Sequence, residues 1–198
     1  MELFDPWAGA PLISRELPGT GGQVRASPED FEVEEIPAYP PCGQGPHLFL
    51  WVEKRERNTR DVLQEIARAL KVPERELGVA GQKDRHALTR QLLSVPNVQA
   101  KRAEGLAGEG WRVLWARPHG NKLKTGHLAG NRFRIRVRGC SPDAAARARA
   151  IADALERDGL PNLYGPQRFG RAGANVPLGR ALVKGGQAPD LARARRDR

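Results

Sequence analysis

The sequence HLFLWVEK at residues 47–54 decides the fold prediction, because its dense apolar and aromatic side chains are typical of a strand buried in a sheet. Similar short runs lie on both sides of it along the chain. They are FEVEEI at residues 31–36, QLLSV at residues 91–95 and WRVLWARP at residues 111–118. A further run, RFRIRVR at residues 132–138, alternates strictly, which predicts a strand with one apolar face and one arginine face.

Two helices are predicted between these strands and after them. Asn58 or Thr59 can cap the first helix, and Pro73 ends it. Its apolar face carries Val62, Leu63, Ile66 and Leu70. The sequence Ser-Pro-Asp at residues 141–143 begins the second helix, and Gly159 ends it. Strands and helices do not alternate regularly, so we expect an α+β fold with a mixed, largely antiparallel sheet and packed helices.

Length and charge restrict the class of protein. The chain has 198 residues, enough for one domain or for one domain and a fragment of a second. Its 33 basic and 23 acidic residues give a net charge of +10, which favours a nucleic acid or an acidic membrane surface as partner. The alternative is an arginine-rich composition inherited from a GC-rich genome. Residues 36–52 lack charge but contain four prolines, so they cannot form a membrane helix, and nucleic acid is favoured.

Several kinds of chemistry have no support in the sequence. Cys42 and Cys140 lie far apart, and the four histidines lack the spacing of metal ligands, so we expect no disulfide and no metal. No phosphate-binding GxxxxGK[ST], strand-linked GxGxxG or nucleophilic GxSxG motif is present. We expect no signal peptide, because the N-terminal residues lack a basic start and carry Glu2 and Asp5, and the expected location is the reducing cytoplasm.

Residues 81–91, GQKDRHALTRQ, place one carboxylate among potential cations. Asp84 is followed by Arg85 and His86 and preceded by Lys83. An oriented, ionised aspartate can act as a nucleophile or as a base. On charge alone, however, a surface turn with a neutralised aspartate is the better interpretation.

The segment GQKDRHALTRQ resembles the catalytic motif of the TruD family of tRNA pseudouridine synthases. Three further segments resemble the family in the same order: RASPEDFEVEE at residues 25–35, HLAGNRFRIRVRG at residues 127–139 and GLPNLYGPQRFG at residues 159–170. Residues 58–72, NTRDVLQEIARALKV, are similar to the helix that precedes the catalytic motif. The resemblance spans residues 18–176, and four ordered motifs are far more specific than one.

The resemblance implies an isomerase that acts on tRNA, at the uridine conventionally numbered 13. It would break the bond between uracil N1 and ribose C1′, turn the base and rejoin it through C5, with no cofactor, metal or ATP. Asp84 would be the catalytic carboxylate, which either attacks C1′ or removes the ribose 2′ proton. The alternative function is that of a catalytically inactive RNA-binding fragment or pseudo-enzyme.

The same resemblance implies a set of substrate-binding residues and a second group near the cleft. The substrate-binding residues are Lys83, Asn131, Phe133, Phe31 and Arg25. The group near the cleft comprises Asn162, Gln167, Arg168 and Phe169. Phe31 and Phe133 have core packing as their alternative role. The side chains of Arg134, Arg136 and Arg138 either bind phosphates or form a solvated face.

The resemblance also indicates that the chain is shorter than the family pattern. Family members continue past the QRFG motif into an inserted domain, and then return with a GSFAT-like segment that completes the catalytic domain. We therefore expect residues 1–170 to form an incomplete pseudouridine-synthase-like catalytic domain. Residues 171–198 are expected to be the start of the inserted domain or a disordered basic tail. A partner chain that supplies the missing elements is a further expectation.

Overall fold

The computed structural model describes residues 12–163, 165, 169 and 175–183. The chain divides into two compact units. One is Gly21–Pro142, and the other consists of the described parts of Met1–Thr20 and Asp143–Arg198.

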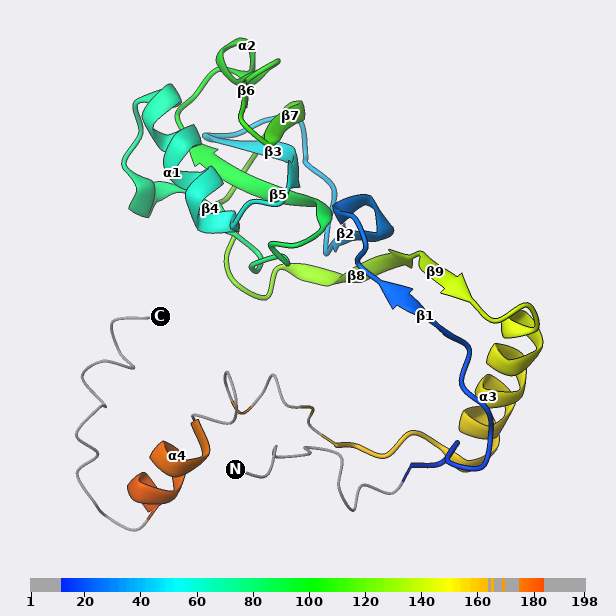
Figure 1. Ribbon diagram of the computed structural model, residues 1–198. Coiled ribbons are helices and arrows are strands. Elements are labelled where there is room, and N and C mark those ends of the chain that lie inside the picture. The colour runs from blue at the N-terminus through cyan, green and yellow to red at the C-terminus, as the bar shows by residue number, and fades with distance from the viewer. Residues whose placement is uncertain (1–11, 164, 166–168, 170–174, 184–198) are drawn as a thin grey trace. The chain divides into compact units, whose positions relative to one another are not determined.

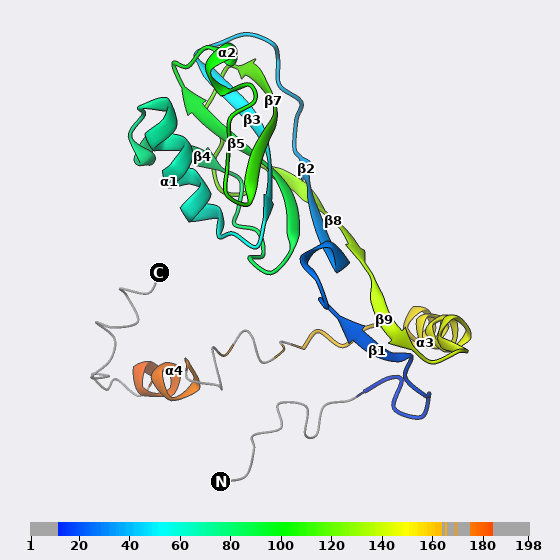
Figure 2. The same cartoon turned by 45° about the horizontal axis from the view of Figure 1, so that its top comes forward.

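The unit Gly21–Pro142 is built on a seven-stranded sheet (Figures 1 and 2). Its strands are β2 (Phe31–Pro37), β3 (His47–Arg55), β4 (Gly78–Val79), β5 (Leu88–Pro96), β6 (Ala107–Gly108), β7 (Trp111–His119) and β8 (Leu128–Ile135). They run in the order β6-β7-β3-β5-β2-β8, and β4 pairs separately with β5. The β2–β5 pair is parallel and the other pairs are antiparallel, which confirms the prediction of a mixed, largely antiparallel sheet.

Helix α1 (Thr59–Leu70) packs on one face of this sheet and forms the larger core with it. Because alternate residues of a strand share a face, Leu48, Leu50 and Val52 of β3 all belong to this core. The predicted apolar face of the helix meets them through Val62, Ile66 and Leu70. The helix is capped by Asn58 and ends at Leu70, where Lys71 adopts a left-handed conformation with φ of 59°. It therefore ends slightly before the predicted stop at Pro73.

The opposite face of the sheet carries a smaller core of Phe49, Ala80, Leu92 and Leu123. Beside it lies a row of alternating charges that crosses three strands. Arg90 of β5 lies within 4 Å of Glu53 of β3 and of Glu32 and Glu34 of β2. One arginine is thus surrounded by three glutamates on this face.

The predicted strand at residues 132–138 is two strands in the structure. Strand β8 ends at Ile135 on β2, and β9 (Val137–Cys140) pairs instead with β1 (Gly21–Val24). Between them, the Arg136 amide donates a hydrogen bond to the Asp30 carbonyl of the 3-10 turn η1 (Pro28–Asp30), 2.8 Å away, and this contact interrupts the ladder. The apolar side chains Phe133, Ile135 and Val137 are 53%, 47% and 41% exposed, so the predicted apolar face is not buried in the core.

Short elements connect the strands. They are the 3-10 turn η2 (Glu74–Glu76) and the single-turn helix α2 (Ala100–Ala103). Gly78 of β4 permits a close approach, because a Cβ atom there would lie 2.2 Å from the Leu123 carbonyl oxygen. Strand β4 thus sits against β5 and leads the chain directly into residues 81–87.

The second unit contains α3 (Ala144–Asp158) and α4 (Asn175–Val183). The N-cap residue of helix α3 is Asp143 rather than Ser141, because the Asp143 carbonyl accepts the hydrogen bond of the Arg147 amide. The Asp143 carboxylate accepts a hydrogen bond from the Arg147 guanidinium. Gly159 follows its last residue, as predicted, with φ of 82°. No helix among the described residues is long and apolar enough to cross a membrane. The domain boundary at residue 170 stays a prediction.

Candidate active site

Asp84 lies in the connection between β4 and β5, and its side chain is 40% exposed. The Nη2 atom of Arg25 is 3.3 Å from Asp84 Oδ1. The same guanidinium lies over the Phe31 ring, with Cζ 3.8 Å from the ring centroid, which is a cation–π arrangement. Arg25 has φ of 59°, an uncommon conformation for a residue with a side chain. Residues 59 positions apart are thus joined through one arginine.

The aromatic side chains predicted to bind substrate lie next to this ion pair. The Phe31 and Phe133 rings meet edge to face, with centroids 6.1 Å apart and an interplanar angle of 67°. Phe133 lies opposite Val33, and Asn131 lies opposite Glu35, in the antiparallel pairing of β2 with β8. Because directly opposite residues share a face, Phe31, Phe133 and Asn131 all lie on the face of the sheet that α1 covers further along. The 53% exposure of Phe133 argues against core packing and leaves ring surface available for stacking.

Lys83 is oriented away from solvent. Its Nζ atom lies 2.8 Å from Glu35 Oε2, and the two side chains are 5% and 0% exposed. Glu35 Oε1 also accepts a hydrogen bond from the Leu92 amide at 3.2 Å. Sequence reasoning missed Glu35, although a signal exists. In FEVEE the alternation places this glutamate on the same face as Val33, which is buried.

A buried polar network supports the main chain around Asp84. Thr59 Oγ1 accepts a hydrogen bond from the Lys83 amide at 3.1 Å and donates to Gln91 Oε1 at 2.9 Å. The Gln91 side-chain amide donates to the Gly81 carbonyl at 3.1 Å. Thr59 is a cap candidate by its sequence position, but it is the first residue of α1, and its side chain binds the loop instead. The N-terminus of α1 and strand β5 therefore both bind the main chain of the loop that carries Asp84.

Lys54 belongs to the same network and was also missed from the sequence. Its Nζ atom donates hydrogen bonds to the carbonyl oxygens of Asp84, at 2.7 Å, and of Lys83, at 3.3 Å. Burial lowers the pKa of Lys54 from 10.5 to about 8. The positive charge of Lys83 also lowers this pKa, whereas the negative charge of Asp84 raises it. The sequence carries a signal for Lys54, because alternate residues of a strand share a face and Lys54 continues the buried face of Leu48, Leu50 and Val52.

The predicted roles of the group near the cleft stay predictions. Asn162 and Phe169 are exposed and belong to the unit that contains α3. Gln167 and Arg168 lie outside the described residues.

The arginines proposed for phosphate binding differ in their surroundings. Arg138 makes two hydrogen bonds, of 2.7 and 2.8 Å, to the fully buried Asp30, and this contact holds the pKa of the Asp30 carboxyl below its usual value. The Nη1 atom of Arg134 lies 3.8 Å from Glu32 Oε1, at ion-pair distance. Arg138 is thus bound within the fold, whereas Arg136 contributes its amide to the strand break and has an exposed side chain.

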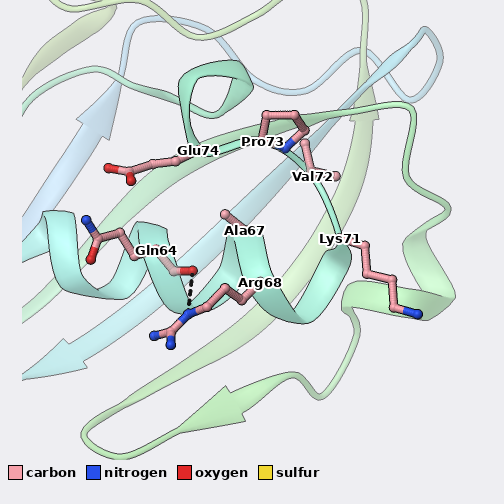
Figure 3. A pocket seen from close by; sticks show the side chains of 7 residues that line it. All are labelled: Gln64, Ala67, Arg68, Lys71, Val72, Pro73 and Glu74. Carbon is pink, nitrogen blue, oxygen red and sulfur yellow. Dashed lines mark hydrogen bonds between the residues drawn. The ribbon is translucent and has the colours of Figure 1, made fainter.

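Two hollows of the surface differ in their relation to Asp84. The larger, about 640 Å³, lies beside the end of α1 and the turn after it, where Arg68 contacts the Gln64 carbonyl (Figure 3). The smaller, about 340 Å³, is lined by Arg25, Glu56, His86 and residues 26–28. We place the candidate site at the smaller hollow, because Arg25 connects it to Asp84 and the larger one contains none of the predicted site residues.

Comparison with known proteins identifies the family of the chain. The family described as tRNA pseudouridine synthase D (TruD) matches residues 8–190. A tRNA pseudouridine synthase D from Anaeromyxobacter sp. (strain Fw109-5) is 56% identical over 96% of this chain and 53% of its own length. The relative of the same name from Thermus thermophilus is 48% identical over 89% of this chain and 50% of its own length. The chain therefore belongs to the TruD family.

A solved structure shows the same fold. The crystal structure assigned to tRNA pseudouridine synthase D of Methanosarcina mazei matches 87% of this chain with a TM-score of 0.74 and 34% identity, and the match covers 40% of that protein. The chain thus spans about half the length of the curated relatives it matches.

Proposed function

We propose that this chain converts a uridine of tRNA to pseudouridine, with Asp84 as the catalytic carboxylate. The observation that carries the proposal is the contact of Arg25 with both Asp84 and Phe31 in a chain of the TruD family. It connects one part-exposed carboxylate with one cation and a pair of aromatic rings, and the same arginine lines the smaller hollow. That combination suits a flipped base held beside an acid.

The proposed chemistry exchanges one bond to C1′ for another. The N1–C1′ bond breaks with its electron pair moving to the uracil, while Asp84 either adds to C1′ or takes the 2′ proton. After the base turns, C5 forms the new bond to C1′, the hydrogen at C5 leaves as a proton, and N1 gains a proton. In the addition route, departure of the Asp84 carboxylate from C1′ regenerates the enzyme. In the elimination route, return of the proton to C2′ does so. Neither route requires a cofactor.

The neighbouring residues receive distinct proposed roles. The exposed ring of Phe133, supported by Phe31, stacks on the uracil after it leaves the tRNA stack. Asn131, exposed on β8, offers an amide to the polar edge of the base. Arg25 orients the Asp84 carboxylate. The proposed target is the uridine at position 13, and tRNA as substrate places the protein in the cytoplasm.

The second candidate is an RNA-binding protein that does not catalyse the isomerisation alone. Two observations favour it: the chain covers about half of its relatives' length, and the apolar residues Phe133 and Ile135 of β8 are exposed. A partner chain with the remaining family segments would then complete the site. Both candidates predict binding of tRNA that weakens steeply with salt, so binding does not distinguish them.

Release of tritium from uracil C5 distinguishes the two candidates, since the new bond at C5 must expel that hydrogen. The assay compares the chain with Asp84→Asn on unmodified tRNA labelled at C5. Asp153→Asn, on the exposed surface of α3, is the matched control. We expect release from the wild type and the control and none from Asp84→Asn. A folded, tRNA-binding wild type that releases no tritium would refute catalysis by this chain.

A further inference from the structure

One buried cation is not used by the proposed chemistry. Lys54 lies near the end of β3, is 2% exposed, and continues the buried face of that strand. Lys54 lines a small hollow together with Val52, Thr59, Val62, Gln91 and Leu93. An ammonium group is costly to bury unless its charge and its N–H groups are satisfied. A lysine at this position therefore needs a reason that apolar packing does not supply.

The contacts of Lys54 point to Asp84. The Lys83 carbonyl belongs to the peptide before the Asp84 Cα atom, and the Asp84 carbonyl belongs to the peptide after it. Lys54 Nζ donates to both oxygens, at 3.3 and 2.7 Å. Both peptide planes that flank Asp84 are thus held by one buried group, and the carboxylate retains only its own side-chain rotations.

We propose that Lys54 is a positioning residue that fixes the backbone of Asp84 so that its carboxylate meets Arg25 and the substrate. This inference rests on the proposed catalytic role of Asp84. Lys54 does not touch the carboxylate in the structure, and it acts through main-chain carbonyls alone. Its ammonium form makes charge-assisted hydrogen bonds, which are about twice as strong as neutral ones.

The surroundings of Lys54 make this positioning sensitive to pH. The titratable groups that face it are Asp84 and Lys83 on the loop, with Glu35 of β2 paired to Lys83. The other elements present Thr59 and Val62 from α1 and Gln91 and Leu93 from β5, none of which titrates. Since the pKa of Lys54 is lowered to about 8, loss of its proton weakens both carbonyl contacts at mildly alkaline pH.

The test uses the full chain with Lys54→Met, Lys54→Arg and the exposed Lys101→Met on α2 as matched control. Thermal unfolding establishes that each variant folds. In the tritium-release assay we expect Lys54→Met to lose between about 10-fold and 100-fold in kcat, with KM within about twofold of the wild type. The wild type should lose activity with a midpoint near pH 8, and Lys54→Arg, whose guanidinium stays charged, should lack this midpoint. Unchanged kcat in a folded Lys54→Met would overturn the proposal.

A readout independent of catalysis separates this inference from the proposed function. Carbon-13 at Cε of Lys54 reports its titration in the wild type, and hydrogen exchange reports opening of residues 82–86. We expect both to change with one midpoint near pH 8, even if the chain releases no tritium. An ordinary lysine midpoint, or loop exchange that does not follow the Lys54 titration, would refute the inference. This measurement needs no variant, so it decides the matter if Lys54→Met fails to fold.

Discussion

The buried pair Lys83–Glu35 gives a stability prediction whose size follows from the structure. Glu35→Gln retains an oxygen for the Leu92 amide but leaves the Lys83 ammonium, 5% exposed, without a counter-charge. Removing one partner of a buried ion pair costs about 3–5 kcal/mol. Glu35 Oε2 lies 2.8 Å from Lys83 Nζ but makes no hydrogen bond of good geometry, so we expect the lower end, about 3 kcal/mol.

Urea unfolding measures this cost. With a slope of about 2 kcal/mol per molar urea, the midpoint should fall by about 1.5 M. Glu74→Gln is the matched control, because the Arg60–Glu74 pair is 66% and 42% exposed and such pairs contribute about 0–1 kcal/mol. The double variant Glu35→Gln/Lys83→Met should recover most of the loss, since no unpaired charge remains. A cost below about 1 kcal/mol for Glu35→Gln, or no recovery in the double variant, would refute the reasoning.

Three further predictions concern stability, each measured by urea unfolding. Ile66→Ala, at a fully buried position in the core under α1, should cost about 2–5 kcal/mol, and a loss below 1 kcal/mol would contradict the assignment of this core. Lys71→Gly should stabilise the folded chain by about 0.5 kcal/mol. The left-handed backbone of Lys71 costs about 1–2 kcal/mol, which glycine avoids, whereas the extra conformational entropy that glycine gives the unfolded chain costs about 0.4–1 kcal/mol. Destabilisation by this substitution would contradict the prediction. Burial, aided by the charges of Lys122 and His119, lowers the pKa of His47 below 6.5 in the folded chain. As pH falls, His47 is therefore protonated in the unfolded chain before it is protonated in the folded chain. Stability should therefore decline as pH falls below 6.5, and the decline should be smaller in His47→Gln; an identical decline in that variant would exclude His47 as its source.

The local elements of the fold could largely be predicted from the sequence. Strand β3 and helix α1 follow from short-range patterns, a dense apolar run in one and helical spacing in the other, and both patterns reflect burial against the same core. The break at Arg136 could not be predicted this way. It depends on a hydrogen bond to Asp30, more than a hundred residues earlier, and alternation carries no information on such a contact.

The candidate site shows the same division. Asp84, Arg25, Phe31 and Phe133 were predicted only through the resemblance to a family, and the structure brings them together. The supporting residues were missed because Lys54, Glu35 and Gln91 are polar residues at positions where strand parity predicts a core. The alternation of strand residues identifies these polar residues as unusual, but only the three-dimensional arrangement shows which loop they bind.

The central claim is that this chain itself forms pseudouridine in tRNA with Asp84. The most direct measurement incubates the chain with unmodified tRNA and maps pseudouridine by carbodiimide labelling and primer extension. We expect a reverse-transcription stop that reports uridine 13 for the wild type and no stop for Asp84→Asn. Folded chain that binds the tRNA and yields no pseudouridine, or an Asp84→Asn variant as active as the wild type, would contradict it.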